Sequence, residues 1–320
     1  MKELDDAIRQ MNEWGGEGKP FFFLFDFDLQ KPVVLSLDET TMAGIQYSMS
    51  GNPCVKSDVS VSLAHDGYSL SSYTLQFQKV VDHIRAGDSF LVNLTCQTPV
   101  KLKLPFDQLY TIVRAKYKLL YKNQFLVFSP ETFVQIQDGI ISSYPMKGTL
   151  DASIPNAYQL LLDNLKEKAE HSTIVDLIRN DLSMVATDVT VKRFRYIEEI
   201  SAGKARLLQA SSEITGQLPA DYPFKIGDIL LALLPAGSVT GAPKKRTVEI
   251  IHETETYERG YYTGIFGIFD GRNLDSAVLI RFLENTPDGV IFKSGGGITA
   301  QSDLMQEFEE MIQKIYVPLH

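Results

Sequence analysis

The chain has 320 residues, of which 44% are hydrophobic and 22% are charged, a composition typical of a globular protein with a sizeable core. Forty acidic and 31 basic side chains give a formal net charge of -9 at pH 7, so we expect no nucleic-acid ligand. The 2 cysteines exclude a disulfide framework, and the sequence has neither the order of a signal peptide nor an apolar run of the ~18 residues that span a membrane. We therefore predict a cytoplasmic protein.

The first half of the chain alternates helical and extended patterns. Apolar spacing and turn residues predict, in chain order, a helix ended by Gly15, strands at 21–27 and 33–37, a helix from Tyr73 to Ile84, a strand at 90–100, a helix at 106–122, and strands at 124–128, 133–137 and 140–144. Residues 38–72 carry only weak signals.

The second half begins with a helical pattern and ends with one. The patterns predict helix at 156–184, strands within 188–218, a helix-rich section at 224–255 interrupted at 237–243, strands at 261–269, 276–283 and 290–294, and a final helix at 303–316. Such groups of strands, broken by helices, lack the regular alternation of a doubly wound parallel sheet. We predict an α+β fold in which large sheets pack together and helices lie outside.

Two pairs of glutamates suggest a metal site. Glu167 and Glu170, and likewise Glu307 and Glu310, are three residues apart, so each pair lies on one helix face. Carboxylate oxygens suit Mg²⁺, which takes one or two carboxylates together with water or substrate oxygens. For either pair taken alone, a solvated acidic helix face is the more common explanation.

Two basic residues are candidates for binding an anion. Arg281 lies in a run of apolar residues, so its charge is either held in a cleft, where it grips a carboxylate, or used in a structural ion pair. Lys314 follows Glu310 by one helical turn, and taken alone the two form an ordinary ion pair.

Two glycine-containing segments are candidates for backbone contacts with a ligand. Gly295–Gly297 is expected between the last strand and the last helix, where exposed N–H groups cradle an anion or simply make a turn. The segment 237–244 resembles a phosphate loop but lacks the Gly-Lys-Ser/Thr ending, so we reject a nucleotide site there.

Lys147 and Glu131 are candidates for the chemistry itself. Lys147 directly follows a predicted strand in Pro-Met-Lys-Gly-Thr, and a lysine in a pocket acts as a nucleophile, although most lysines are only solvated. Glu131 ends a neighbouring strand and becomes a general acid if burial raises its pKa.

Seven segments, taken in order, resemble the chorismate-utilising enzymes, the family of anthranilate, aminodeoxychorismate, isochorismate and salicylate synthases. The segments are GDSFLVNLT (87–95), SPETF (129–133), PMKGT (145–149), AEHSTIVDLIRNDL (169–182), AGSVTGAPKKRTVEII (236–251), YYTGIFG (261–267) and SGGGITAQSD (294–303). The resemblance implies two large packed β-sheets with helices outside. It also implies a chorismate-binding catalytic domain at 73–320, with a shortened N-terminal segment, 1–72, packed on it as one structural unit.

The resemblance also implies the ligands of the site. Mg²⁺ would be bound by Glu170 and Glu310, with Glu167 and Glu307 as outer-sphere partners, and Glu131 would be the general acid. Substrate contacts fall on Gly148, Thr149, Thr240, Tyr262, Arg281, Gly296, Gly297 and Lys314. Because chorismate is a dianion, a bound cation and these basic groups explain how an acidic protein holds it.

The choice of reaction depends on two positions. Isochorismate and salicylate synthases resemble one another in a water-activating lysine where this chain has Leu91, so addition of water is disfavoured. Anthranilate synthases usually have Ala where Lys147 stands, whereas aminodeoxychorismate synthases have lysine. The resemblance thus implies component I of aminodeoxychorismate synthase, in which Lys147 attacks C2, the C4 hydroxyl leaves, and ammonia attacks C4 to give 4-amino-4-deoxychorismate for 4-aminobenzoate and folate. Anthranilate synthase component I and a non-catalytic chorismate-binding subunit are the alternatives.

The chain departs from the family in three respects. Leu91 replaces a Gln that is common in ammonia-using members, and Gln209 stands where many members have an active-site His. The N-terminal part is short, so we expect no tryptophan-binding regulatory region. The sequence has no glutaminase segment with a cysteine nucleophile, so ammonia would come from solution or from a separate glutamine amidotransferase subunit.

Overall fold

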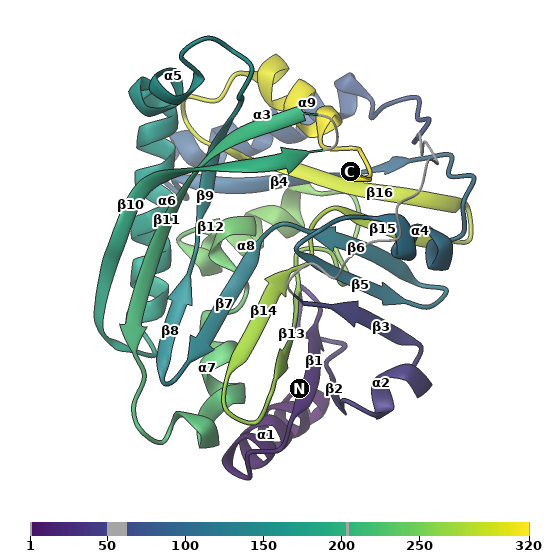
Figure 1. Ribbon diagram of the computed structural model, residues 1–320. Coiled ribbons are helices and arrows are strands. Elements are labelled where there is room, and N and C mark those ends of the chain that lie inside the picture. The colour runs from purple at the N-terminus through teal and green to yellow at the C-terminus, as the bar shows by residue number, and fades with distance from the viewer. Residues whose placement is uncertain (1, 50–62, 203–204, 320) are drawn as a thin grey trace.

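Two antiparallel β-sheets form the centre of the computed structural model, which describes residues 2–49, 63–202 and 205–319 (Figure 1). The nine-stranded sheet has the order β10 (Thr187–Ala202), β11 (Ala205–Gln217), β8 (Ile140–Ser143), β7 (Thr132–Gln137), β14 (Leu274–Val278), β13 (Ile265–Phe269), β1 (Phe21–Phe25) and β2 (Val33–Ser36), with β9 (Met146–Asp151) also paired to β11. The seven-stranded sheet has the order β12 (Gly241–Ala242), β4 (Leu91–Pro99), β16 (Gly289–Ile298), β15 (Phe282–Thr286), β6 (Phe125–Ser129), β5 (Tyr117–Tyr121) and β3 (Ile45–Ser48).

The two sheets pack face to face through aromatic and aliphatic side chains. Phe22 and Phe266 of the nine-stranded sheet belong to the same buried cluster as Tyr117, Phe125 and Phe282 of the seven-stranded sheet. Because each strand alternates its side chains between two faces, the strands that form this cluster send the intervening residues to the helices outside. The prediction of an α+β fold with two large packed sheets is therefore confirmed.

Helices cover the outer faces of both sheets. They are α1 (Lys2–Gly16), α2 (Glu39–Met42), α3 (Leu70–Arg85), α4 (Phe106–Ile112), α5 (Ala157–Asp163), α6 (Leu165–Ser183), α7 (Ile226–Leu233), α8 (Lys244–Thr254) and α9 (Leu304–Gln313). Helices α1, α6 and α7 pack on the nine-stranded sheet, while α3, α8 and α9 pack on β4 and β16 (Figure 1). Among the described residues, no helix has both the length and the apolar character needed to cross a membrane.

Two of the connections between the sheets lie at neighbouring places. The chain leaves β6 and enters β7 through Pro130–Glu131, and it leaves β14 and enters β15 through Leu279–Arg281. The backbone N–H of Val278 donates to the carbonyl of Glu131 at 3.2 Å, which joins the two crossovers. The crossovers therefore bring Glu131 and Arg281 to the same region between the sheets.

Three predicted elements differ from the structure. The helix expected at 106–122 ends at Ile112, because residues 117–121 pair instead with β6 and β3. The strand expected at 276–283 is divided into β14 and β15, since each half joins a different sheet. The strand expected at 290–294 extends to Ile298, so Gly295–Gly297, expected between that strand and the last helix, lie within β16 and pair with β4.

The N-terminal segment contributes strands to both sheets. β1 and β2 form an edge of the nine-stranded sheet, and β3 is an edge strand of the seven-stranded sheet. The division into segments 1–72 and 73–320 remains a prediction, and part of the first segment, 50–62, lies outside the described residues.

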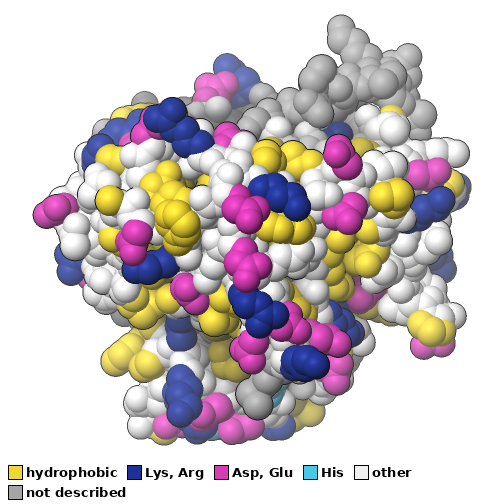
Figure 2. Space-filling model, turned by 90° about the horizontal axis from the view of Figure 1, so that it is seen from below, with side chains coloured by type: hydrophobic (Ala, Val, Ile, Leu, Met, Phe, Trp, Pro, Cys, Tyr) yellow, Lys and Arg dark blue, Asp and Glu magenta, His cyan; other side chains and the backbone are white. Residues whose placement is uncertain are grey.

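One face of the molecule illustrates how the surface charge is distributed. On the face shown in Figure 2, Lys and Arg side chains are interspersed with Asp and Glu side chains and with hydrophobic ones. This face therefore does not present the continuous basic stripe that a polyanion would need, in keeping with the net charge of -9.

Candidate active site

A run of glycines in β16 allows groups from opposite sides to approach one stretch of backbone. A Cβ on Gly296 would lie 3.7 Å from Lys314 Nζ, which extends from the end of α9. A Cβ on Gly297 would lie 3.4 Å from Lys147 Nζ, which extends from β9. Because Gly295–Gly297 carry no side chains, both ammonium groups lie close to the strand, and its backbone is open to a ligand.

A cleft of about 220 Å³ surrounds this stretch of backbone. The predicted site residues that line it are Glu131, Lys147, Gly148, Thr149, Tyr262, Arg281, Gly296, Gly297, Glu310 and Lys314. The other predicted site residues, Glu167, Glu170, Thr240 and Glu307, lie outside this lining. The fold therefore brings together residues that are up to 183 positions apart in the sequence, from Glu131 to Lys314.

Glu131 lies at the first crossover, directly after β6. Its carboxylate accepts a short hydrogen bond from the Ser238 hydroxyl, and its backbone N–H donates to Ser129 Oγ at 3.1 Å. Burial raises the pKa of Glu131, against the hydrogen bond from Ser238 and the positive charges of Lys147 and Arg281. A carboxyl group whose pKa is raised in a cleft is suited to donate a proton.

Lys147 lies in β9, next to an irregularity in the pairing with β11. Met146 pairs with Ser211 and Thr149 with Gln209, so one residue of β11 lies opposite two residues of β9. Gly148, in this bulge, has a φ of 85°, a value that favours glycine. A bulge redirects the side chains beside it, and here Lys147 lines the cleft.

Arg281 does not lie in a strand, as the sequence pattern predicts, but at the second crossover with a φ of 57°. Its side chain lines the cleft, and its guanidinium lies 5.2 Å from the ring centre of Tyr316. The buried Nε atom has no hydrogen-bond partner among the described residues. A buried donor normally has a partner, so this orphan atom fits a site for a carboxylate ligand.

Lys314 follows α9 and contacts both the strand and the helix. Its Nζ donates to the Gly295 carbonyl at 2.8 Å and lies 2.7 Å from Glu310 Oε1. The ion pair expected from the helical spacing is thus confirmed. Burial lowers the pKa of Lys314, while the Glu310 carboxylate opposes this shift. These two contacts hold the ammonium group beside Gly295–Gly297 of β16, the glycine strand.

The four predicted metal ligands approach the cleft from two helices. Glu167 and Glu170 belong to α6, and Glu307 and Glu310 belong to α9. Glu167 Oε2 lies 3.1 Å from the position of a Cβ on Gly148, and Glu307 Oε2 lies 3.6 Å from that of a Cβ on Gly296. Glu170 lines a second cavity, of about 210 Å³, which shares Lys147 and Ile174 with the cleft.

The donor set of these glutamates fits Mg²⁺. Within the described ranges, no three His, Cys, Asp or Glu side chains converge into a cage for a cation. Mg²⁺ does not require such a cage, because it commonly takes one or two carboxylates and completes its shell with water and substrate oxygens. The hard carboxylate oxygens of α6, near Gly148, and of α9, near Gly296, are of the right kind.

Two predicted substrate contacts have different positions. Tyr262 is 3% exposed and lines the cleft, whereas Thr240 is fully buried behind it. The Thr240 hydroxyl donates to the Ala236 carbonyl at 2.9 Å, so in this structure it stabilises the 237–239 turn.

The sequence prediction missed several residues that line the cleft. They are Asn93, Ser238, Lys293 and Ser294. Ser238 lies in the segment that resembles a phosphate loop, and no local pattern indicates its contact with Glu131. Lys293 is 2% exposed and pairs with Glu284 at 2.7 Å, a contact between neighbouring strands that the sequence does not reveal.

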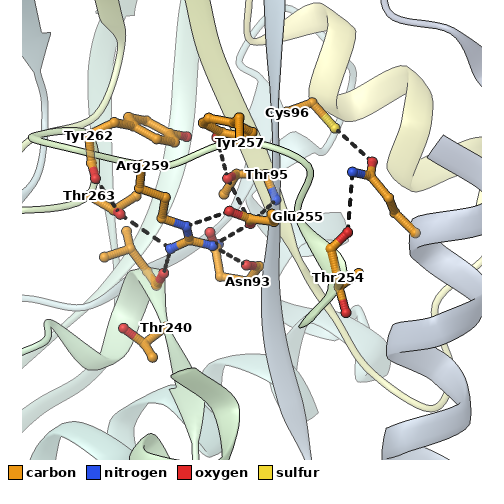
Figure 3. A network of polar contacts seen from close by, with 12 residues as sticks. Asn93, Thr95, Cys96, Thr240, Thr254, Glu255, Tyr257, Arg259, Tyr262 and Thr263 are labelled. Carbon is orange, nitrogen blue, oxygen red and sulfur yellow. Dashed lines mark hydrogen bonds and ion pairs between the residues drawn. The ribbon is translucent and has the colours of Figure 1, made fainter. Parts of the chain in front are cut away.

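A buried network around Arg259 supports one wall of the cleft (Figure 3). Arg259 donates to both oxygens of Glu255, at 2.6 and 2.9 Å. It also donates to the carbonyls of Asn93 at 2.7 Å and Val239 at 2.9 Å, two residues that line the cleft. A planar guanidinium with several fixed acceptors joins β4 rigidly to the 237–239 turn.

The chain resembles known proteins over almost its whole length. The model of a protein family described as chorismate binding enzyme matches residues 34–320. This chain belongs to the family of chorismate-binding enzymes. The chorismate-binding enzyme described here is 46% identical, over 99% of each chain, to an "Uncharacterized PabA-like protein" of Pasteurella multocida.

Two relatives with named activities are less similar to this chain. Aminodeoxychorismate synthase component 1 of Salmonella typhimurium is 33% identical over 78% of this chain and 57% of its own length. Anthranilate synthase component 1 of Bacillus subtilis is 32% identical over 77% of this chain and 50% of its own length. The chain thus spans little more than half of these relatives. The solved structure of the menaquinone-specific isochorismate synthase of Escherichia coli, 17% identical, has the same fold, with a TM-score of 0.72 over 97% of this chain and 80% of that one.

Proposed function

We propose that this protein is component I of aminodeoxychorismate synthase, which converts chorismate and ammonia into 4-amino-4-deoxychorismate. The observation that carries the proposal is that Lys147 and Glu131 line one cleft together with Arg281 and Lys314. This set provides a nucleophile, an acid and two cations for a small dianion. The 33% identity to an enzyme named aminodeoxychorismate synthase component 1 supports the same proposed function.

The binding groups suit the two carboxylates of chorismate. Arg281 has an unpartnered buried donor for one carboxylate, and Lys314 lies at the glycine strand for the other. Glu170 and Glu310 would hold Mg²⁺, with Glu167 and Glu307 as outer-sphere partners. When bound, the metal would supply positive charge for the ring carboxylate and let it lie among acidic side chains.

Lys147 and Glu131 would carry out the first half of the reaction. The lone pair of neutral Lys147 Nζ forms a bond to C2, the two ring double bonds shift, and the C4–O bond breaks. Glu131 gives its proton to the departing C4 oxygen, which leaves as water. Without this proton, hydroxide would be a poor leaving group.

Ammonia would complete the reaction at C4. Its nitrogen forms a bond to C4, the double bonds shift back, and the C2–N bond to Lys147 breaks. The product carries the nitrogen at C4, and Lys147 returns to its neutral form. Leu91 disfavours the addition of water at C2, because its apolar side chain lines the cavity beside Lys147 and cannot activate water.

The ammonia would come from a separate glutamine amidotransferase subunit, and the product would lead to 4-aminobenzoate and folate. A cytoplasmic location goes with that pathway and remains a prediction. The same chain would also accept ammonium salts supplied in solution.

Product analysis by mass spectrometry tests the proposal. The protein is incubated with chorismate, Mg²⁺ and ammonium, with and without added aminodeoxychorismate lyase. We expect 4-amino-4-deoxychorismate without the lyase and 4-aminobenzoate with it. Anthranilate fluorescence in the absence of lyase would instead identify anthranilate synthase component I. Chorismate binding with no turnover would favour a non-catalytic subunit.

A further inference from the structure

Another, much smaller cavity lies directly behind Glu131. Its volume is about 20 Å³, enough for one water molecule. Glu131 and Ser238 line both this cavity and the cleft, so the pair forms a wall between them. Asp181 and Ser143 also line the small cavity, and they give a water the polar partners that it needs.

Asp181, which lines this cavity, also belongs to an ion pair. Its Oδ2 lies 2.9 Å from Lys244 Nζ, an ion pair between α6 and α8 whose side chains are 12% and 17% exposed. A Cβ on Gly237 would lie only 2.9 Å from the same oxygen, so the turn that carries Ser238 lies directly against Asp181. The ion pair is therefore partly open to solvent and borders the cavity behind Glu131.

The charges of this pair are compatible with proton exchange. Burial raises the pKa of Asp181, with Lys244 opposing, and burial lowers the pKa of Lys244, with Asp181 opposing. Both shifts bring the charged pair closer in energy to its neutral form. Moving a proton between the two groups is thus easier than between the same groups in water.

The proposed reaction requires one proton from outside in every turnover. Glu131 gives its proton to the leaving C4 oxygen, which departs as water. Ammonia enters neutral, and its nitrogen becomes an aliphatic amine that leaves as an ammonium ion at neutral pH. The three hydrogens of ammonia leave in this ammonium group and the proton of Glu131 leaves in the water, so Glu131 can become a carboxylic acid again only if solvent supplies a proton.

We propose that the Asp181–Lys244 pair and a water in the small cavity return this proton from solvent to Glu131. This inference rests on the proposed function, because it assumes that Glu131 is the general acid. The O–H bond of the water breaks as its proton passes to Glu131, and the water regains a proton that the Lys244 ammonium gives up through the Asp181 carboxylate. The Lys244 amine is then protonated again from solvent. Asp181 acts here through Glu131 and does not contact the substrate.

Rapid-quench kinetics of Asp181→Asn in the intact chain test the proposal. The first turnover uses the proton already on Glu131, so its rate should be preserved, whereas later turnovers should slow by about tenfold or more. The measured quantity is the ratio of first-turnover rate to steady-state rate, which should rise at least about tenfold above that of the unmutated protein. An unchanged ratio, whether both rates fall together or neither falls, overturns the proposal because a purely structural role predicts it.

A second variant tests the same proton path if Asp181→Asn does not fold. Val134 lines the small cavity, and Val134→Ile adds one methylene that displaces the water while leaving the ion pair in place. We expect the same rise in the ratio, and its absence in a folded Val134→Ile protein overturns the proposal.

Asp176→Asn provides the matched control, because Asp176 lies on the same helix with its side chain 61% exposed. Its ratio should equal that of the unmutated protein. If the unmutated protein forms no 4-amino-4-deoxychorismate, the proposed function fails. If it forms the product and the ratios do not change, only the proton path fails.

Discussion

The Ser238 hydroxyl donates a hydrogen bond to Oε1 of Glu131 at the place where the chain crosses from one sheet to the other. Ser238 lies in the 3₁₀ turn 237–239, which the Arg259 network holds through the Val239 carbonyl. The carboxyl group expected to donate a proton is therefore oriented by a hydroxyl on a fixed turn. A flexible glutamate in an open cleft would lack this orientation.

Replacing Ser238 by alanine should change both the rate and its pH dependence. The hydrogen bond from Ser238 lowers the pKa of Glu131, so its loss should raise that pKa further. A general acid works only below its pKa, and the loss of activity at alkaline pH should therefore begin at a higher pH in Ser238→Ala. We also expect kcat to fall about tenfold with little change in KM, because the acid is less well oriented.

The pH profile of kcat checks this prediction. Ser183→Ala is the control, because Ser183 is exposed on α6 and its hydroxyl donates to the Arg179 carbonyl. An alkaline limb that moves to lower pH, or does not move, would show that Ser238 does not act on Glu131.

Replacing Lys147 by alanine should abolish turnover but leave binding intact. The substitution removes the proposed nucleophile while Arg281, Lys314 and the glutamates of α6 and α9 remain. We expect the rate to fall by at least about a thousandfold, while the Kd for chorismate, measured by calorimetry with Mg²⁺ present, changes less than about threefold.

Lys79→Ala, on the exposed face of α3, serves as the control for loss of a lysine. If chorismate binding is lost together with turnover, Lys147 is an electrostatic anchor and not a nucleophile. A covalent adduct of the unmutated protein, trapped without ammonia and located at Lys147 by mass spectrometry, would support the role of Lys147 as a nucleophile.

The sequence motifs predicted which residues share the cleft better than local patterns predicted the elements that carry them. Arg281 illustrates the difference. The apolar run on both sides of it is compatible with one strand, but β14 pairs with β13 and β7 whereas β15 pairs with β16 and β6. The partner of each half is chosen by long-range pairing, which no window of local sequence contains.

The glycine strand was unpredictable for a related reason. Three glycines weaken a strand in isolation, so a turn is the reasonable local expectation. In the structure Gly295–Gly297 are held by β4 on one side, and the missing side chains make room for groups from β9 and α9. Ser238 is a further case, because its contact with Glu131 joins residues 107 positions apart.

Replacing Glu310 by glutamine should weaken the dependence of chorismate binding on Mg²⁺. The substitution keeps the size of the side chain and removes a charged oxygen from the proposed metal site. We expect the Mg²⁺ concentration that gives half-maximal chorismate binding to rise about tenfold or more. Glu170→Gln, on the facing helix, should have an effect of the same sign.

Calorimetric titration of chorismate at a series of Mg²⁺ concentrations measures this effect. Glu309→Gln is the matched control, since Glu309 is the adjacent exposed glutamate of α9. If the titration of Glu310→Gln coincides with that of the control, α9 does not provide a metal ligand.

Replacing Arg259 by methionine should destabilise the fold strongly, because it leaves a buried charge without its cation. The Arg259 and Glu255 side chains are 1% and 2% exposed, and Thr95 would remain to donate to the carboxylate from its backbone and its hydroxyl. Breaking a buried pair in this way costs about 3–5 kcal/mol of the free energy of unfolding. Arg9→Met, which removes a 64% exposed arginine on α1, should cost less than about 1 kcal/mol. Urea unfolding followed by circular dichroism compares the two variants, and equal stability would mean that the network in Figure 3 is not a structural support of the cleft.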